Sequence, residues 1–339
     1  MKSVYNIAIV GATGVVGQEF LKILAERDFP VGELRLLASE RSQGKKIAYQ
    51  GKEYTVEATT EQSFERIDIA LFAGGEASRL YGPAAVAAGA IVIDNSSTFR
   101  FDPEVPLVVP EVNPEDVLWH KGIIANPNCS TIQLVVVLKP LHDVAKIKRI
   151  IVSTYQAVSG AGSEAIDEML SQSREFSADP NAPVEPHVFP HQIAFNLIPH
   201  IDIFLDNDYT KEEMKIVWET RKMFHDEDIQ ISATAVRVPV LRCHSEAVYI
   251  ETESSLTLGA VREILAGAPG VVVIDDVKAN AYPMPITAFD TDEVYVGRIR
   301  EDISTENGLA LWIVADQVRK GAATNAIQIA ELLIEKGLV

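Results

Sequence analysis

Cysteine is scarce in this chain: only Cys129 and Cys243 occur among 339 residues, and there is no Cys-x-x-Cys pair. Two cysteines cannot build the disulfide framework of a small secreted protein. Their scarcity therefore favours a protein of the reducing cytoplasm. On cysteine counts alone, each thiol is best interpreted as a small buried hydrophobe unless its neighbours indicate chemistry.

Positive charge is also in short supply, and long apolar runs are absent. The chain carries 48 acidic against 30 basic side chains, a formal charge of -18 at pH 7. This excess repels nucleic acid and anionic lipid, so any anionic ligand needs a few locally placed basic residues. No apolar run approaches the length of a membrane span, and no signal-peptide pattern precedes the first one. We therefore expect a cytoplasmic protein with neither nucleic acid nor membrane as a partner.

The order of apolar runs predicts two domains, as the length of the chain also suggests. In the first third, short runs alternate with segments of helical length, which predicts βαβ units and a parallel sheet. These runs are residues 7–10, 33–38, 68–73, 91–94 and 122–125. Later runs alternate in polarity, which is typical of antiparallel strands with one face on a core. They include residues 149–155, 246–252, 270–275 and 293–300. The tail, residues 322–336, places its apolar side chains on one helical face.

A glycine-rich loop follows the first predicted strand. It reads Gly11-Ala12-Thr13-Gly14-Val15-Val16-Gly17 and precedes a helical pattern at residues 19–25. Glycines allow a tight turn and a close approach of the backbone to a pyrophosphate, whose charge then meets a helix N-terminus. The spacing departs from G-x-G-x-x-G, but the strand, turn and helix are the context that a dinucleotide site requires. We interpret the loop as a nucleotide site, and a merely tight turn is the alternative.

The second predicted strand ends at Ser39-Glu40-Arg41-Ser42. An NAD-binding protein usually offers a carboxylate to the ribose 2'-hydroxyl at this point. Ser39, Arg41 and Ser42 can instead donate to a 2'-phosphate, which favours NADP if Glu40 turns away. The alternative is that Glu40 and Arg41 are exposed loop charges.

Cys129 lies in Asn126-Pro127-Asn128-Cys129-Ser130-Thr131, directly after the apolar run at residues 122–125. If a helix begins there, its unpaired N–H groups and the positive end of its dipole favour thiolate over thiol. The helix is one of two readings, because the β-branched run at residues 135–137 also fits a buried strand. The length of the apolar stretch, residues 132–141, favours the helix.

A second polar constellation comes later in the chain, at residues 237–245 around a predicted strand. Arg237 and His244 are seven residues apart there, and histidine is suited to proton transfer near neutral pH. Taken alone, Arg237 reads as a surface charge and His244 as a hydrogen-bonded structural residue. His187 and His191 have a spacing compatible with metal ligation, but they lack a second ligand pair, so we expect no metal site.

Taken together, these motifs resemble the aspartate-semialdehyde dehydrogenase family, and the resemblance runs nearly end to end. The matching segments are residues 11–14, 94–100, 109–113, 126–133, 153–162, 194–196, 212–215, 237–245 and 320–323. The resemblance implies an α/β fold: a Rossmann-type nucleotide-binding domain plus an α+β catalytic and dimerisation domain with a mixed, largely antiparallel sheet. We expect an NADP-binding domain at residues 1–128, completed by a C-terminal helix at 320–339, and a catalytic and dimerisation domain at 129–319. A homodimer is implied as well.

The same resemblance implies a role for each matching residue. Cys129 forms an acyl thioester, His244 is the general acid/base, and Gln156 positions the thiol and the substrate. Arg237 clamps the substrate carboxylate, a task that suits a bidentate donor. Glu212 holds the substrate amino group, unless Glu213 is the residue in register. The remaining implied contacts are Arg100, Lys215 and Asn128 to substrate or inorganic phosphate, and Gly11, Thr13, Gly14, Val15, Val16, Ser39, Arg41, Ser42, Ser159, Gly160 and Gln317 to the cofactor.

Each of these roles has a plainer alternative. Glu212 and Lys215 also fit an ion pair on an exposed helix, and Arg100 fits a solvated surface charge. For the whole chain, the alternatives are a related acyl-phosphate reductase, such as N-acetyl-glutamyl-phosphate reductase, and a non-catalytic NADP(H)-binding regulator. The reductase is disfavoured by Asn128-Cys129-Ser130-Thr131, since its family resembles Gly-Cys-Tyr-Pro there. The regulator is disfavoured by the joint presence of Cys129, Gln156, Arg237 and His244.

Overall fold

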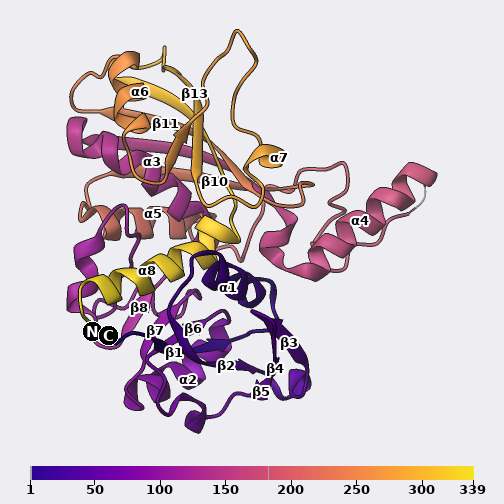
Figure 1. Cartoon of the computed structure of the whole chain (residues 1–339). Helices are drawn as coiled ribbons and strands as arrows, with labels where there is room; N and C mark the ends of the chain where they lie inside the picture. Colours follow the sequence, from indigo (N-terminus) through magenta and orange to yellow (C-terminus); the bar gives the residue numbers. More distant parts are fainter. Residues whose placement is uncertain (1, 182) are drawn as a thin grey trace. The chain divides into compact units, whose positions relative to one another are not determined.

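The computed structural model describes residues 2–181 and 183–339, and its contacts divide the chain into two compact units. The first unit comprises Met1–Asn128 and Gly321–Val339, and the second comprises Cys129–Lys320. Figure 1 shows both, coloured along the chain. Each unit is built around its own six-stranded sheet. None of the helices in the described residues combines the length and the apolar character that crossing a bilayer requires.

The sheet of the first unit is parallel throughout, in the order β5-β2-β1-β6-β7-β8. Its strands are β1 (Tyr5–Val10), β2 (Val31–Ala38), β5 (Glu57–Ala58), β6 (Ile69–Phe72), β7 (Ile91–Asp94) and β8 (Ile123–Ala125). A separate hairpin joins β3 (Lys46–Tyr49) to β4 (Lys52–Thr55). The strand order reverses between β1 and β6, and ligands of open parallel sheets bind beyond the carboxyl ends of strands at such a point.

Helices cover both faces of this sheet, which explains why its strands are continuous apolar runs. Helices α1 (Val15–Glu26) and α8 (Thr324–Glu335) contribute to the apolar cluster on one face. Helix α2 (Gly75–Ala87) contributes to the cluster on the other face. Short 3-10 turns complete the unit: η1 (Glu40–Ser42), η2 (Glu61–Phe64) and η3 (Pro114–Trp119).

The sheet of the second unit is mixed, in the order β10-β9-β11-β14-β13-β12. The two outer pairs are parallel and the three inner pairs are antiparallel. Its strands are β9 (Ile147–Ala157), β10 (Gln230–Val238), β11 (His244–Thr252), β12 (Val271–Val273), β13 (Val294–Glu301) and β14 (Gly308–Ala315).

Three helices, α3 (Cys129–Ala145), α5 (Lys211–Phe224) and α6 (Leu258–Ala266), pack against this mixed sheet. Helix α4 (Ser163–Ala178) follows the 3-10 turn η4 (Val158–Ala161) and extends away from the sheet in Figure 1. The unit also contains the one-turn helix α7 (Pro285–Ala288). After β14 the chain enters the π-helical turn η5 (Arg319–Ala323).

The fold class predicted from the sequence is confirmed, and so are the five early strands and the helix that begins at Cys129. Two local expectations were wrong. The run at residues 270–275 was expected to be an antiparallel strand, but β12 (Val271–Val273) pairs with β13 in parallel. Residues 237–245 are not arranged around a single strand: Arg237 lies near the end of β10 and His244 begins β11. Strand β9 lies between those two strands in the sheet. Arg237 and His244 are therefore brought to either side of β9, instead of to the two ends of one strand.

Candidate active site

The glycine loop of the first unit has the geometry that a pyrophosphate needs. Gly11 has φ +88°, a left-handed value that favours glycine. A Cβ on Gly17 would lie 2.2 Å from the Gly11 carbonyl oxygen, so only glycine allows α1 to pack this closely on the loop. Helix α1 begins at Val15, directly after Gly14. The N–H groups of its first turn, Val15 and Val16 among them, have no partner within the helix and can bind an anion.

A cavity of about 440 Å³ opens beside this loop in the first unit. Residues from the end of β1, the end of β2 and the start of α2 line it, including Gly11, Ser39, Glu40, Arg41 and Glu76. Thr13 Oγ1 lies 3.4 Å from Ser42 Oγ, which links the glycine loop to the turn after β2. Gly11, Ser39 and Arg41, three of the predicted cofactor residues of this unit, thus line one cavity, and Glu40 lines it together with them.

Cys129 is the first residue of α3 in the second unit, and its side chain is partly exposed. The adjacent Ser130 is buried and accepts a hydrogen bond at 2.9 Å from Gln156 Nε2. The same amide lies 3.3 Å from Thr154 Oγ1 and 3.2 Å from Glu212 Oε1. Gln156 is 1% exposed. Its contacts with Ser130 and Glu212 connect the start of α3 and the start of α5 to β9.

The structure distinguishes Glu212 from Glu213. Glu213 Oε2 accepts from the Thr210 N–H and Glu213 Oε1 from the Ala235 N–H, so this carboxylate caps α5 and ties it to β10. Glu212 instead joins Gln156 and Lys215, whose Nζ lies 3.0 Å from Glu212 Oε2 and 2.8 Å from Asp202 Oδ2. The plainer alternative placed this ion pair on an exposed helix face. The face is buried instead, since Glu212 is 5% and Lys215 9% exposed.

Arg237 is buried, and so is not the surface charge that a plain reading suggested. It is in register with Gln156 on β9, and its Nη1 donates to the Ala157 carbonyl at 2.8 Å. Its guanidinium carbon lies 5.8 Å from the centre of the Phe189 ring. Burial lowers the pKa of Arg237, and negative charge on Glu212 and on Cys129 opposes that shift. The guanidinium therefore lies within the electrostatic range of both groups.

His244 is fully buried at the start of β11. Its Nδ1 accepts a hydrogen bond from the Ala157 N–H at 3.1 Å, and Nε2 has no partner among the described residues. Burial, together with the charge on Arg237, lowers its pKa to about 3. A Cβ on Gly160 would lie 2.9 Å from Arg237 Nη1 and 3.4 Å from His244 Nε2. Both side chains thus converge on the bare backbone of Gly160.

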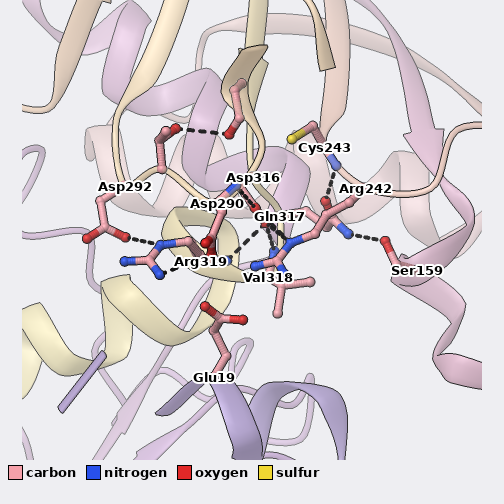
Figure 2. Close-up of polar contacts among 12 residues, drawn as sticks. Glu19, Ser159, Arg242, Cys243, Asp290, Asp292, Asp316, Gln317, Val318 and Arg319 are labelled. Carbon is pink, nitrogen blue, oxygen red and sulfur yellow. Dashed lines mark hydrogen bonds and ion pairs between the residues drawn. The ribbon is translucent and has the colours of Figure 1, made fainter. Parts of the chain in front are cut away.

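Ser159 and Gln317 are also in contact in the second unit. Gln317 Nε2 donates to Ser159 Oγ at 2.6 Å, and Figure 2 shows the amide between Ser159 and Cys243. Arg100 and Asn128 belong to the first unit, where both are buried. Arg100 donates to the Asn126 carbonyl at 2.9 Å and to the Asn95 carbonyl at 2.8 Å. It therefore holds the segment that leads, three residues later, to Cys129.

Comparison with known proteins adds the family. The family described as semialdehyde dehydrogenase, NAD binding domain, matches residues 6–120, and semialdehyde dehydrogenase, dimerisation domain, matches residues 138–320. An aspartate-semialdehyde dehydrogenase of Aquifex aeolicus is 59% identical over 339 residues, covering 99% of both chains. The chain belongs to the aspartate-semialdehyde dehydrogenase family. It has the oxidoreductase activity of that family, and its first unit binds a nicotinamide cofactor.

Two solved structures of the family are similar over almost the whole chain. The first is aspartate semialdehyde dehydrogenase II from Vibrio cholerae, described as complexed with ASA. It has a TM-score of 0.95 and 50% identity, and the match covers 98% of this chain and 99% of that one. The second, from Candida albicans, is described as a complex with NADP. It has a TM-score of 0.78 and 26% identity, and the match covers 99% of this chain and 100% of that one. These comparisons favour this family over both alternatives considered from the sequence.

Some polar groups of the site escaped the sequence analysis. Ser130 and Thr154 are the partners of Gln156, and the Ala157 backbone binds both Arg237 and His244. Strand periodicity could have indicated Thr154, because it lies two residues before Gln156 and so shares its face. Nothing in the sequence indicates Ala157, because it contributes to the site only through its backbone N–H and carbonyl groups.

Proposed function

We propose that the chain catalyses the reversible, NADP-dependent reductive dephosphorylation of L-aspartyl 4-phosphate. NADPH, the acyl phosphate and a proton give L-aspartate 4-semialdehyde, NADP and phosphate, in the biosynthesis of lysine, threonine and methionine. One observation carries the proposal. Gln156 Nε2 is bonded to both Ser130, next to Cys129, and Glu212, while Arg237 and His244 share the Ala157 backbone. A nucleophile, a carboxylate clamp, an ammonium partner and an imidazole thus belong to one cluster.

Cys129 is the nucleophile of this proposal. The N-terminus of α3 and the guanidinium of Arg237 both favour the thiolate. In the reductive direction the thiolate attacks the acyl carbon, phosphate leaves, and a thioester remains on Cys129. A bound nicotinamide supplies the hydride that reduces this thioester and accepts one in reverse. Gln156 keeps the start of α3 fixed through Ser130 while the sulfur carries the acyl group.

His244 acts at Nε2, because Nδ1 is engaged by a group that can only donate. A neutral imidazole whose Nδ1 accepts must carry its proton on Nε2. With a pKa of about 3 the ring is neutral across the physiological range. A ring with so low a pKa is a weak base. In place of the general acid/base role that the resemblance implies, we therefore assign Nε2–H as the donor to the oxyanion that develops as hydride reaches or leaves the substrate carbon, a contact worth on the order of 3 kcal/mol.

Charge complementarity supports the substrate assignment. Arg237 matches the α-carboxylate and Glu212 the α-amino group, and the cluster already places these two charges near each other. Lys215 and Arg100 are the proposed phosphate contacts, and Asn128 is a proposed substrate contact. Lys215 shares its charge with Glu212 and Asp202, so a phosphate must compete with carboxylates for it.

The preference for NADP is supported by Arg41, which lines the cavity beside the glycine loop together with Ser39. Glu40 lines the same cavity and would repel a 2'-phosphate, so the preference depends on Arg41. We expect Arg41→Ala to raise the KM for NADP about tenfold or more and to leave the KM for NAD unchanged. Equal effects on both cofactors would contradict the assignment. Ser39→Ala is the milder comparison, since it removes a donor but no charge.

We also propose that the working form is a cytoplasmic homodimer. The dimerisation-domain family covers residues 138–320. The outer side of the mixed sheet exposes Ile151 and Tyr249, and Trp312 lines a cavity of about 400 Å³ there. Sedimentation across a concentration series tests this assembly, and a monomer at micromolar concentration would contradict it.

The decisive assay follows NADPH formation from the semialdehyde with and without phosphate. We expect turnover that requires phosphate and is abolished by Cys129→Ala. The acyl phosphate of N-acetyl-glutamate, offered in the reverse direction, should not be reduced. Substantial turnover in the Cys129→Ala variant, or turnover independent of phosphate, would refute the covalent route.

A further inference from the structure

Cys243 directly precedes His244 and has a left-handed backbone, with φ +75°. Such a conformation is unfavourable for a residue with a side chain and persists only where the surroundings hold it. The side chain is buried with Ala288 and Val314 in an apolar cluster. This packing fills space but does not set the backbone angle. The groups that bind the backbone on either side of Cys243 must do that.

The β11–β14 ladder ends at this point. His244 pairs with Ala315 in the antiparallel register, and no pair continues beyond them. Side chains from Asp316 and Gln317 take over where the backbone bonds stop. Gln317 Oε1 accepts from the Cys243 N–H at 2.7 Å, and its Nε2 donates to Ser159 Oγ at 2.6 Å. One amide therefore connects the residue before His244 with Ser159.

Asp316 holds the neighbouring residue, Arg242, through its side chain. Its carboxylate is completely buried, and Arg242 Nε lies 2.8 Å from Oδ1 and 2.7 Å from Oδ2. Oδ1 also accepts from the backbone of Val318, and Oδ2 from the backbone of Asp290 at 2.9 Å. Figure 2 shows Arg242 and Cys243 facing Asp316 and Gln317. Two consecutive residues on one side are thus bound by two consecutive residues on the other.

This double contact has a consequence for the reaction. Arg242 and Cys243 are the two residues that lead into His244, and Gln317 is, with Ser159, one of the side chains for which the family resemblance implies a cofactor contact. Asp316 and Arg242 touch neither substrate nor cofactor in the roles assigned above. Their ion pair joins the residue two positions before His244 to the residue directly before Gln317.

We propose that Asp316 and Arg242 are positioning residues: their ion pair, whose carboxylate is buried, sets the left-handed turn at Cys243 and so fixes His244 Nε2 relative to the Ser159–Gln317 pair. The inference rests on the proposed function, in which His244 serves the reacting carbon, and on the cofactor contact that the family resemblance implies for Gln317. A displacement of about 1 Å at such a site can cost about 100-fold in rate. The effect should therefore fall on hydride transfer, whereas Arg237, Glu212 and Lys215 still bind the substrate.

The test is Asp316→Asn, which keeps the shape of the side chain and removes its charge. The measured quantity is the rate constant of hydride transfer in the first turnover, with semialdehyde and phosphate in excess. This rate constant does not depend on the fraction of enzyme that is folded, whereas the amplitude does. We expect this rate constant to fall about 100-fold, with the KM for the semialdehyde unchanged. Arg242→Lys should act in the same direction, since one ammonium cannot replace a guanidinium at both carboxylate oxygens. It also keeps the test open if Asp316→Asn fails to fold.

Asp292→Asn is the matched control. Asp292 Oδ1 binds Arg319 Nε at 2.8 Å, so this variant removes an arginine–aspartate pair of the same patch without touching residues 242, 243 or 317. Its rate constant should stay within about twofold of the parent. The inference is overturned if the Asp316→Asn rate constant equals that of the control, or if only the amplitude of the hydride transfer falls. A parent enzyme without phosphate-dependent turnover would instead refute the proposed function, which separates the two failures.

Discussion

The two cysteines of the second unit have opposite surroundings. Cys129 begins α3, is partly exposed and lies within the electrostatic range of Arg237. Cys243 is fully buried in an apolar cluster, where burial and the nearby Asp316 carboxylate raise the pKa of its thiol. The surroundings of Cys129 therefore favour a thiolate, whereas those of Cys243 keep the thiol protonated. A helix terminus and a guanidinium, and not the cysteine itself, account for the difference.

The largest expected effect comes from replacing each of the two cysteines by alanine in turn. Cys129→Ala should lower kcat on the order of 10⁴-fold, because no other group can carry the acyl intermediate. Cys243→Ala should leave acylation at Cys129 intact and cost about 1 kcal/mol of stability through the cavity that it opens. Steady-state kinetics and thermal unfolding of both variants measure this. A loss of acylation in Cys243→Ala would show that the buried thiol has a chemical role.

Arg237 gives the surroundings of Cys129 their positive charge, so its replacement is the second expected effect. Arg237→Lys should raise the KM for the semialdehyde about 10- to 100-fold, because a lysine cannot donate to both the Ala157 carbonyl and a carboxylate in the same geometry. Arg237→Gln, which also removes the positive charge, should slow alkylation of Cys129 by iodoacetamide, because the thiolate loses a neighbouring cation. An unchanged alkylation rate would show that Arg237 does not stabilise the Cys129 thiolate.

Gly160 tests how closely the surroundings of the Cys129 site are packed. An added Cβ would lie 2.9 Å from Arg237 Nη1 and 3.3 Å from His244 Cε1. We expect Gly160→Ala to lower kcat/KM about tenfold or more, since overpacking of about 1 to 3 kcal/mol must be relieved by moving one of these side chains. Gly259→Ala, whose new Cβ would meet only Thr257 Oγ1 at 4.0 Å, is the control. Equal kinetics for the two variants would show that Arg237 and His244 accommodate an added methyl group at Gly160 without a change in the site.

Glu246 extends the comparison to a second group whose charge burial suppresses, and its replacement should change stability with little effect on activity. Both carboxyl oxygens are buried without a hydrogen-bond partner among the described residues. Burial raises the pKa of Glu246 well above its usual range, and Gln133 opposes this shift only in part. Above the pKa of the unfolded chain, the folded state keeps a proton that the unfolded state has lost. Stability should then fall as pH rises, by about 1.4 kcal/mol per pH unit.

Glu246→Gln removes this titration and imitates the neutral acid. We expect the free energy of unfolding of the variant to exceed that of the parent at pH 8 and to approach it near pH 5. Urea unfolding at a series of pH values measures the difference. Parallel curves for the two proteins would show that Glu246 is ionised in the folded state.

Much of the fold could be predicted from the sequence, because parallel strands that are buried on both faces are continuous apolar runs. The run at residues 91–94 is β7 within the same bounds, and residues 7–10 belong to β1. Other strands were missed. β14 is apolar without alternation, a pattern that a buried helix also shows. The hairpin of β3 and β4 is short and largely exposed, so it has little hydrophobic signal.

The site could be predicted only as a set of residue types. The resemblance gave Gln156, Arg237 and His244, but not their arrangement on three adjacent strands. That arrangement depends on β9 lying between β10 and β11, a pairing between residues far apart in the sequence. The partners of the site, such as Thr154 and Asp316, depend on the same pairing. The choice between Glu212 and Glu213 needed the capping contacts of Glu213, which connect α5 to Ala235.

The central claim is that the surroundings of Cys129 make it the acylated thiol. Its most direct measurement is a rapid quench of the enzyme with semialdehyde and NADP in the absence of phosphate, followed by peptide mapping by mass spectrometry. We predict one aspartyl adduct, on the peptide that contains Cys129, formed at the rate of NADPH appearance and removed by added phosphate. A burst of NADPH without an adduct on Cys129, or an adduct on Cys243, would contradict the account.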